Sequence, residues 1–334
     1  MIAMVDLVTV IGTGQMATVC SAMLAERGVP VRMWGADRAS IEALKSTREN
    51  ERYLPGFRIP DRVSFTHDRA RAFEGADLIV SAIPCQYMRA VWEKLADDCP
   101  KDVPIVSVAK GIENETLLRP TQILCDVLGD VMVGTLSGPS VAAELARRLP
   151  ATVVAASESE WLAKLVQESF ASQWFRVYTN SDLVGVEIAG ATKNIIALAA
   201  GILDGLKAGD NAKAALLTRG LVEITRLGVS LGAQRETFAG LAGLGDLVTT
   251  CVSPVGRNRS AGELIGKGKT AQEVIDATPW VIEGIPTTRS VRELARRQNI
   301  EMPITEAVHA VLFEGKDVLE TLTELMSRKL KGEG

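Results

Sequence analysis

Short apolar runs alternate with amphipathic stretches along the first half of the chain. The runs are four to eight residues long and rich in β-branched side chains, and they occupy residues 7–12, 29–34, 62–65, 76–83, 104–109, 131–137 and 151–156. Runs of this length, separated by helical periods, are typical of βαβ units with a mostly parallel sheet. The pattern predicts a doubly wound sheet with helices on both faces.

Strand signals stop near residue 181, and the second half of the chain has helical periodicity. We expect long helices over residues 183–203 and 212–227, followed by further helices that are broken at residues 240–246, 266–270 and 302–304. The sequence therefore predicts an α/β protein. A doubly wound, Rossmann-type domain at residues 1–180 is followed by an all-helical domain at residues 181–330.

The segment 188–203 is apolar and about the length of a short membrane span, yet it contains Lys193 and Asn194 and is rich in glycine and alanine. A buried ammonium without a partner is costly. We interpret the segment as a buried core helix and expect no membrane insertion. The presence of a charged lysine in a buried helix then requires an explanation.

The composition limits the partners that the protein can have. The chain has 334 residues, of which 47% are hydrophobic, and a formal net charge of −4. This balance argues against a broad basic surface for nucleic acid or an anionic membrane, so any anionic ligand must meet a local basic cluster. The five cysteines are odd in number and widely spaced, and the N-terminal run "LVTVIGTG" has no basic leader before it. We expect a cytoplasmic protein with reduced thiols.

Histidine is scarce, because only His67 and His309 are present. This scarcity argues against a multi-histidine metal site and against a Ser/His/Asp triad. We therefore expect no metal, and a lysine or carboxylate as any catalytic acid or base.

A glycine motif follows the first predicted strand. Gly12, Gly14 and Ala17 form GxGxxA between that strand and a helix. The first glycine permits a tight turn, the second lets a pyrophosphate approach the backbone, and the small third residue lets helix and strand pack closely. The motif predicts a dinucleotide site at the helix N-terminus. After the second strand, Asp37 favours a ribose hydroxyl and Arg38 favours a 2′-phosphate, so NAD and NADP both stay open.

Five later segments occur in a characteristic order: "SVAKGIE", "SGPSVAAELA", "GATKNIIALAAGI", "GLGDLVTTC" and "GRNRSAGELIGKG". With the glycine motif, they resemble the bacterial type of NAD(P)-dependent glycerol-3-phosphate dehydrogenases over nearly the whole chain. The resemblance implies a helical domain like the C-terminal domain of 6-phosphogluconate dehydrogenase. It also implies reversible reduction of dihydroxyacetone phosphate, a small phosphorylated substrate, to sn-glycerol 3-phosphate for phospholipid synthesis, with NAD or NADP as cofactor. The apolar helical half favours a homodimer.

The resemblance also implies roles for individual residues, with Lys193 of "ATKN" as the catalytic acid or base. The positions that match substrate contacts are Lys110, Gly138, Ser140, Lys193, Asp246, Gly256, Arg257 and Asn258. The positions that match cofactor contacts are Gly12, Gly14, Gln15, Met16, Ala17, Ala36, Lys110, Ala142, Arg257, Val281 and Glu283. The chain departs from the bacterial pattern at three of these. Gln15 and Met16 stand where serine and an aromatic are common, and Ala36 stands where a basic or polar side chain is common.

The chemistry of these residues agrees with the implied reaction. Hydride reduction of a ketone leaves an alkoxide that must receive a proton, and Lys193 can supply it. Arg257 can bind a phosphate through two hydrogen bonds. Simpler interpretations stay open: Lys193 extending to solvent from a buried helix, Asp246 capping a helix, and Lys110 or Arg257 as surface residues.

Two other functions also stay open. A related dehydrogenase that acts on 6-phosphogluconate, 3-hydroxyisobutyrate or ketopantoate would share the glycine motif and a lysine on a helix. It would not be expected to carry "GLGDLVTTC" followed by "GRNR". A dinucleotide sensor would keep the glycines and lose the acid and the phosphate-binding groups, which are both present here.

Overall fold

The computed structural model describes residues 5–329 and 332. The chain divides into two compact units. The sheet unit comprises the residues up to Lys110 together with Leu118–Glu187, and the helical unit comprises Gly111–Leu117 and the residues from Ile188 onward. The division into two domains at residues 180 and 181 stays a prediction.

One sheet of eight strands forms the centre of the sheet unit, in the order β10-β9-β8-β7-β6-β1-β2-β5. Its strands are β1 (Val8–Ile11), β2 (Val31–Trp34), β5 (Val63–Thr66), β6 (Leu78–Ser81), β7 (Ile105–Ser107), β8 (Val133–Ser137), β9 (Ala151–Ala156) and β10 (Phe175–Asn180). Neighbouring strands are parallel except for β8 and β9, which are antiparallel. The seven predicted strands and the mostly parallel sheet are confirmed. The sequence pattern did not indicate β10 or a separate hairpin, β3 (Glu49–Asn50) and β4 (Leu54–Arg58).

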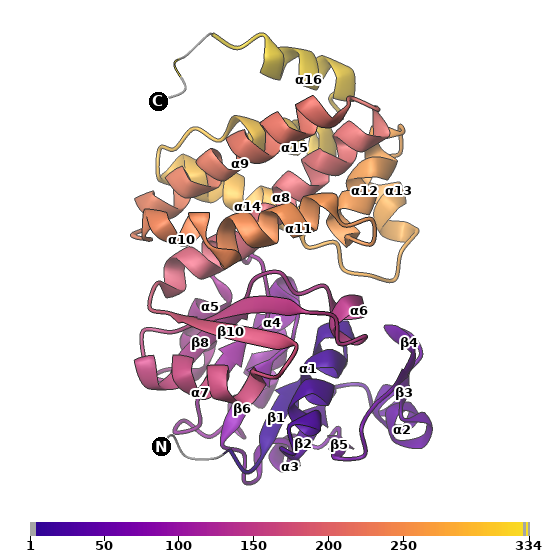
Figure 1. Ribbon diagram of the computed structural model, residues 1–334, viewed down its shortest axis with the longest axis vertical. Helices are drawn as coiled ribbons and strands as arrows, with labels where there is room; N and C mark the ends of the chain where they lie inside the picture. Colours follow the sequence, from indigo (N-terminus) through magenta and orange to yellow (C-terminus); the bar gives the residue numbers. More distant parts are fainter. Residues whose placement is uncertain (1–4, 330–331, 333–334) are drawn as a thin grey trace. The chain divides into compact units, whose positions relative to one another are not determined.

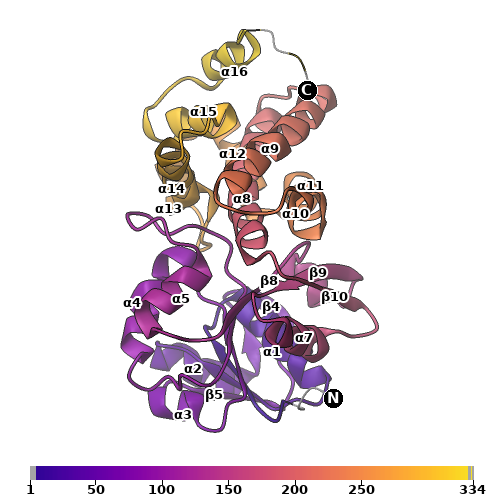
Figure 2. The same ribbon diagram turned by 90° about the vertical axis from the view of Figure 1, so that its left-hand side faces the viewer.

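Helices cover both faces of this sheet, as predicted (Figure 2). They are α1 (Gln15–Glu26), α2 (Arg38–Thr47), α3 (Arg69–Phe73), α4 (Cys85–Leu95), α5 (Pro120–Leu128), α6 (Ala142–Leu145) and α7 (Glu160–Phe170). Side chains of α1 and α7 pack in one core cluster, and side chains of α4 and α5 pack in the other. The central strands face a core on both sides, which explains their continuous apolar runs.

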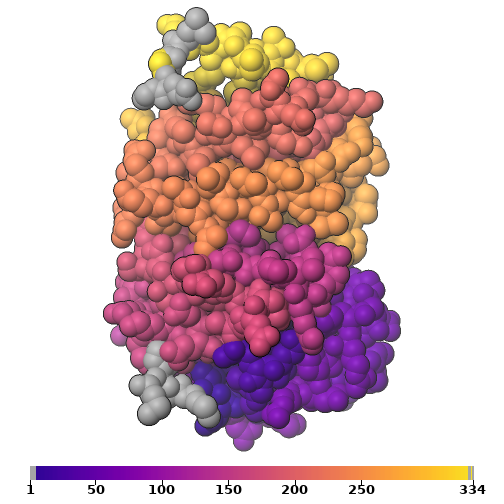
Figure 3. Space-filling model, viewed as in Figure 1, coloured from indigo at the N-terminus to yellow at the C-terminus, as the bar shows by residue number. Residues whose placement is uncertain are grey.

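The helical unit contains only helices among its described residues from 188 to 329, together with their connections. The helices are α8 (Leu183–Gly205), α9 (Asp210–Ser230), α10 (Arg235–Ala239), the π-helical turn η1 (Leu241–Gly245), α11 (Asp246–Val252), α12 (Arg257–Gly266), α13 (Ala271–Asp276), α14 (Gly284–Arg297), α15 (Pro303–Phe313) and α16 (Val318–Met326). Figure 1 shows α8 behind α11. In Figure 3, α9 (salmon) and α11 (orange) form much of the visible face of this unit.

By length and composition alone, α8 could cross a membrane, but its most apolar stretch is entirely buried inside the protein. This burial agrees with the predicted core helix. The predicted break at residues 240–246 is wrong in part, because Leu241–Gly245 is itself helical and runs into α11. The glycines there serve close packing: a Cβ atom at Gly243 would overlap the carbonyl group of Phe238.

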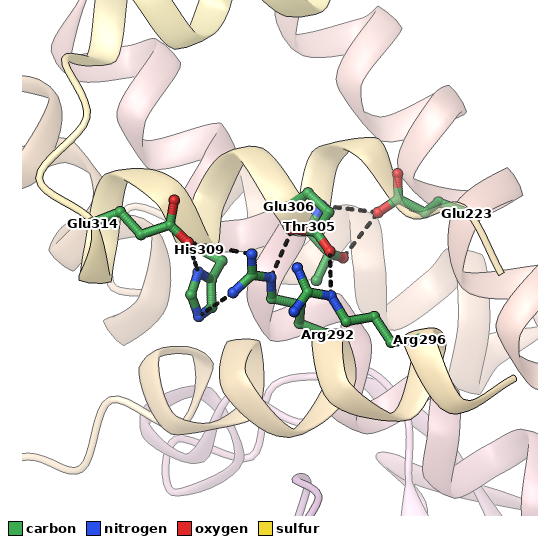
Figure 4. Close-up of polar contacts among 7 residues, drawn as sticks. All are labelled: Glu223, Arg292, Arg296, Thr305, Glu306, His309 and Glu314. Carbon is green, nitrogen blue, oxygen red and sulfur yellow. Dashed lines mark hydrogen bonds and ion pairs between the residues drawn. The ribbon is translucent and has the colours of Figure 1, made fainter. Parts of the chain in front are cut away.

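Two helices are capped by buried carboxylates from distant parts of the chain. Glu187 accepts hydrogen bonds from the main-chain N–H (2.9 Å) and the hydroxyl (2.7 Å) of Thr121, at the start of α5. Glu223 likewise accepts from the main-chain N–H (2.9 Å) and the hydroxyl (2.8 Å) of Thr305, at the start of α15 (Figure 4). Burial raises the pKa of both carboxyl groups, and the hydrogen bonds oppose this. These carboxylates satisfy N–H groups that a helix start leaves without partners.

Candidate functional site

The glycine motif lies at the carboxyl end of β1, where the strand order reverses. β1 pairs with β2 on one side and with β6 on the other, and the chain continues outward from each of these neighbours. Open α/β sheets bind their ligands in the crevice at such a switch point. The predicted dinucleotide motif is therefore at the edge of the sheet where a ligand is expected.

Gly12 is required by both its conformation and its surroundings. Its φ angle is +125°, and a Cβ atom would lie 2.9 Å from the carbonyl oxygen of Ala82, which follows β6. The N–H of Gly12 donates to the carbonyl of Trp34 at 2.8 Å. A side chain here would therefore strain the turn and separate β1 from β6.

The start of α1 has the features of an anion site. Gly14 is the N-cap residue, and it provides no side-chain cap. A Cβ atom at Gly14 would meet no atom within 4 Å, so this position borders open space. Ala17 is fully buried against the sheet, Gln15 is half-buried, and Met16 packs against the core. The first N–H groups of α1 are thus available to a ligand phosphate.

The loop after β2 leaves the choice of cofactor open. Asp37 caps α2 by accepting hydrogen bonds from the N–H groups of Ser40 (2.9 Å) and Ala39 (3.3 Å). The hydroxyl and the N–H of Ser40 lower the pKa of Asp37, so its carboxyl group stays ionised. Ala36 and Arg38 are exposed. The carboxylate of Asp37 already caps α2, and Arg38 follows it directly in the chain. Neither residue alone therefore selects NAD or NADP.

Lys110, Gly138 and Ser140 come together, although they belong to two separate motifs. The ammonium of Lys110 donates to the carbonyl of Gly138 at 2.9 Å and to the hydroxyl of Ser140 at 3.2 Å. Lys110 follows β7 and Gly138 follows β8, which are parallel neighbours, so their carboxyl ends meet at one edge of the sheet. Ala142, the first residue of α6, is half-buried close behind them in the chain. These contacts hold a cation at the ligand-binding edge.

Lys193 lies in the middle of α8, and the structure supplies the partners that its burial requires. Its side chain is 7% exposed, and its ammonium lies 3.0 Å from the carboxylate of Asp246, which is 3% exposed. The ammonium also donates to the hydroxyl of Thr250, one turn along α11 from Asp246. The interpretation that Lys193 extends to solvent from a buried helix is therefore wrong. Burial raises the pKa of the neighbouring Cys251 to about 12, so this residue stays a thiol.

Glycines allow α8 and α12 to approach one another closely. A Cβ atom at Gly201 on α8 would overlap the carbonyl of Arg259, and one at Gly262 on α12 would overlap the carbonyl of Leu198. Near the start of α12, Asn258 donates to the side-chain oxygen of Asn194 at 2.9 Å. This packing fixes the first turn of α12 beside the segment that carries the lysine.

The first turn of α12 presents basic and main-chain donors. Gly256 is the N-cap residue and provides no side-chain cap. Arg257 is exposed, and its guanidinium donates to the carbonyl of Val281 at 3.3 Å. Desolvation of the guanidinium lowers the pKa of Arg257, and the negative charge of Glu283, the half-buried residue before α14, opposes this shift. The side-chain oxygen of Asn258 accepts from the N–H of Gly284 at 2.9 Å, so its amide also has a structural use.

Some residues near the predicted site have a structural role. Others contact site residues, although the sequence did not predict them. Arg259 lies 2.7 Å from Asp204 and is held in an ion pair within the helical unit. Thr250 and Asn194 contact predicted site residues. Both lie inside the quoted motifs "GLGDLVTTC" and "GATKNIIALAAGI", but neither was predicted, because the resemblance implies no role for them. His309 lies in a polar cluster with Arg292 between α14 and α15 (Figure 4).

The comparisons with known proteins cover both units. Residues 7–163 match the family model for the N-terminus of NAD-dependent glycerol-3-phosphate dehydrogenase, and residues 182–323 match the model for its C-terminus. The chain belongs to the NAD-dependent glycerol-3-phosphate dehydrogenase family. The family resemblance expected from the motifs is confirmed.

Individual members of the family are similar over their full length. The chain is 45% identical to the glycerol-3-phosphate dehydrogenase [NAD(P)+] of Citrifermentans bemidjiense, over 99% of this chain and 100% of that protein. It is 47% identical to the enzyme of the same name from Chlorobium phaeobacteroides, over 98% of each. The crystal structure of glycerol-3-phosphate dehydrogenase from Coxiella burnetii has a TM-score of 0.93 and 37% identity, covering 97% of this chain and 99% of that one.

Proposed function

We propose that this protein catalyses the reversible reduction of dihydroxyacetone phosphate to sn-glycerol 3-phosphate, with NADH or NADPH as the hydride donor. The observation that carries the proposal is the buried ion pair of Lys193 and Asp246, in a chain that belongs to this dehydrogenase family over both units. A buried ammonium held by a carboxylate and a hydroxyl is suited to proton transfer.

The sheet unit fits a dinucleotide. Gly12 makes the tight turn against Ala82, Gly14 borders open space, and the uncapped start of α1 offers N–H groups to the pyrophosphate. We propose that the remaining cofactor contacts fall on Gln15, Met16, Ala17, Ala36, Lys110, Ala142, Arg257, Val281 and Glu283. When bound, the nicotinamide supplies the hydride for reduction or accepts it for oxidation.

Lys193 completes the reduction by giving a proton. The hydride adds to the carbonyl carbon of dihydroxyacetone phosphate, and the carbonyl π electrons move to oxygen. The ammonium of Lys193 transfers its proton to that oxygen, which leaves an alcohol and a neutral amine that regains a proton from solvent. Asp246 and Thr250 hold the ammonium in place. In the reverse direction the neutral amine takes the proton from the alcohol.

The phosphate of the substrate is expected to bind at the first turn of α12. Gly256, Arg257 and Asn258 supply main-chain N–H groups, a guanidinium and an amide there. We propose further substrate contacts for Lys110, Gly138 and Ser140. The local basic groups then meet the need for a cation cluster in a protein of net negative charge.

One assay tests the function directly. The purified protein is mixed with NADH or NADPH and dihydroxyacetone phosphate, and loss of the reduced cofactor is followed by its absorbance. We expect turnover with the phosphorylated ketone and almost none with unphosphorylated dihydroxyacetone. Activity with ketopantoate or 3-hydroxyisobutyrate in place of dihydroxyacetone phosphate would show that the substrate is misassigned.

Both cofactors should be used. Because Ala36 carries no charge and Asp37 is occupied by α2, we expect kcat/KM for NADH and NADPH to differ by less than about a hundredfold. A ratio above about a thousandfold would mean that another residue recognises the 2′ position of the ribose.

We further propose that the enzyme is a cytoplasmic homodimer that supplies glycerol 3-phosphate for phospholipids. The support for a dimer is a row of exposed apolar side chains on η1 and α11, Leu244, Val248 and Val252, which are spaced four residues apart. Light scattering coupled to gel filtration measures the mass, and the variant Val248→Asp should shift a dimer toward monomer. A monomeric wild-type protein contradicts this part of the proposal.

A further inference from the structure

The hairpin β3–β4 contributes one buried amide to the glycine loop. Asn50, the last residue of β3, is 5% exposed. Its side-chain NH₂ donates to the carbonyl of Thr13 at 2.9 Å and to the hydroxyl of Thr18 at 2.8 Å. Its side-chain oxygen accepts from the N–H of Tyr53 at 3.2 Å. Because the carbonyl of Thr13 can only accept, the orientation of the amide is fixed by chemistry.

These contacts reach two successive carbonyl groups of the loop. Asn50 contacts the carbonyl of Thr13 directly. The hydroxyl of Thr18, which accepts from Asn50, donates in turn to the carbonyl of Gly14 at 3.1 Å. The carbonyl groups of residues 13 and 14 belong to the same peptide units as the N–H groups of Gly14 and Gln15. These are the first N–H groups that face the open space at the start of α1.

A trans peptide is planar, and its C=O and N–H point in opposite directions. Holding the carbonyl of Thr13 therefore fixes the direction of the N–H of Gly14, and holding the carbonyl of Gly14 fixes the N–H of Gln15. Such support matters at Gly14, because glycine has more backbone freedom than any other residue and no atom lies within 4 Å of the position that a Cβ atom would take.

The rest of the loop is held on its other sides. Gly12 lies against Ala82 after β6, and a Cβ atom at Gly35 would lie only 2.5 Å from the methyl group of Thr13. The hairpin is itself fixed, since the guanidinium of Arg48, just before β3, donates to the carbonyl of Val63 at 2.8 Å. Asn50 thus connects a rigid hairpin with the one stretch of the loop that steric contacts leave undetermined.

We propose that Asn50 is a positioning residue for the cofactor, acting with Thr18 to hold the N–H groups of the glycine loop toward the pyrophosphate. This inference rests on the proposed function. Without Asn50 the glycine loop would still form, but its backbone would keep its freedom until the cofactor binds. Binding of the cofactor would therefore weaken while the substrate site stays intact.

The test compares three variants with a matched control. Asn50→Ala removes the donor, Asn50→Asp replaces the donor by an acceptor of equal size, and Thr18→Val removes the hydroxyl with little change in volume. The control is Thr9→Val, which removes a buried hydroxyl that donates to the carbonyl of Ala72 at 2.6 Å, on β1 but away from the loop. For each protein, NADH binding is titrated by fluorescence without substrate, and Tm is measured.

We expect Asn50→Ala to raise the Kd for NADH about tenfold, which is the factor expected when one residue's backbone freedom must be lost on binding. Asn50→Asp should raise it more, Thr18→Val a few-fold, and Thr9→Val less than about twofold even where its Tm falls equally. The KM for dihydroxyacetone phosphate at saturating NADH should stay within about twofold in every variant. A purely structural role of Asn50 would lower Tm and leave the Kd of the folded fraction unchanged.

The outcomes separate this inference from the function on which it rests. Wild-type protein that binds no NADH overturns the proposed function and this inference with it. Wild-type protein that binds NADH, with an equal Kd in folded Asn50→Ala, overturns the positioning role alone. If Asn50→Ala does not fold, an unchanged Kd in Thr18→Val overturns the role in the same way. That variant removes the hydroxyl that connects Asn50 with the carbonyl of Gly14 and leaves only the helical hydrogen bond from the N–H of Thr18.

Discussion

Replacing Lys193 by methionine tests both the catalytic assignment and the electrostatics of α8. Methionine keeps most of the length and the apolar stem of lysine but carries no proton to donate. The variant removes the ammonium that lies 3.0 Å from the carboxylate of Asp246, in a place where both side chains are almost completely buried. The result is a buried carboxylate without its cation.

The magnitudes follow from this burial. Removing one partner of a buried ion pair destabilises a protein by about 3–5 kcal/mol, because the remaining charge has lost its compensation. The catalytic step should slow by about 10²- to 10⁴-fold, as is typical when a general acid is removed. Binding of NADH should change little, because Lys193 is not among the residues proposed to contact the cofactor.

Two further variants identify the cause of each effect. In Lys193→Met/Asp246→Asn the uncompensated charge is gone, so we expect most of the lost stability to return while activity stays low. Lys213→Met is the matched control. It removes a lysine paired with Asp204, a carboxylate that keeps Arg259 at 2.7 Å, so it should cost about 1 kcal/mol or less and leave turnover unchanged.

The measurements are urea unfolding followed by circular dichroism, a fluorescence titration with NADH, and steady-state turnover. Near-normal turnover of Lys193→Met would refute the role of the lysine as acid. Failure of the double variant to regain stability would refute the electrostatic explanation, since the loss would then come from packing of the methionine side chain.

Three other predictions test separate parts of the structure. Arg257→Ala should raise the KM for dihydroxyacetone phosphate strongly with a smaller change in kcat, and an unchanged KM would make Arg257 a surface residue without a role in binding. Gly262→Ala would place a Cβ atom on the carbonyl of Leu198, so urea unfolding should show a loss of about 1–3 kcal/mol or more; wild-type stability would mean that α8 and α12 can separate without cost. Burial lowers the pKa of His309, Arg292 lowers it further, and Glu314 opposes both effects. Below about pH 6.5 the unfolded chain therefore binds more protons than the folded one. Stability should therefore fall as the pH is lowered through this range, less steeply in His309→Gln, and equal slopes for the two proteins would contradict the assignment.

The sheet was predictable because its strands are buried on both faces and appear in the sequence as continuous apolar runs. β10 was missed because its side chains alternate between buried and exposed, and the hairpin β3–β4 was missed because most of its residues face solvent. Because glycines usually end helices, the sequence predicts a break at the turn η1. Here Gly243 serves close contact with Phe238, which depends on tertiary packing.

The site was predictable where one residue type is required by local geometry or by a motif. Gly12 is such a case, since its φ angle and its contact with Ala82 both exclude a side chain. The partners of Lys193 are different: Thr250 is 57 residues away along the chain, and only the packing of α11 against α8 brings them together. Asn50 is likewise 37 residues from Thr13, in a hairpin that the hydrophobic pattern does not reveal.

The capping of α5 by Glu187 has a consequence for cutting the chain into fragments. A fragment that ends at residue 180, where the strand signals stop, would contain α5 but lack the carboxylate that receives the N–H and hydroxyl of Thr121 and the guanidinium of Arg119. Such a fragment should fray at the start of α5, and extending it by one or two turns of α8 should restore the cap. The first residues of α8 are therefore needed by the sheet unit as well, and the shortest autonomous nucleotide-binding fragment should end beyond Glu187.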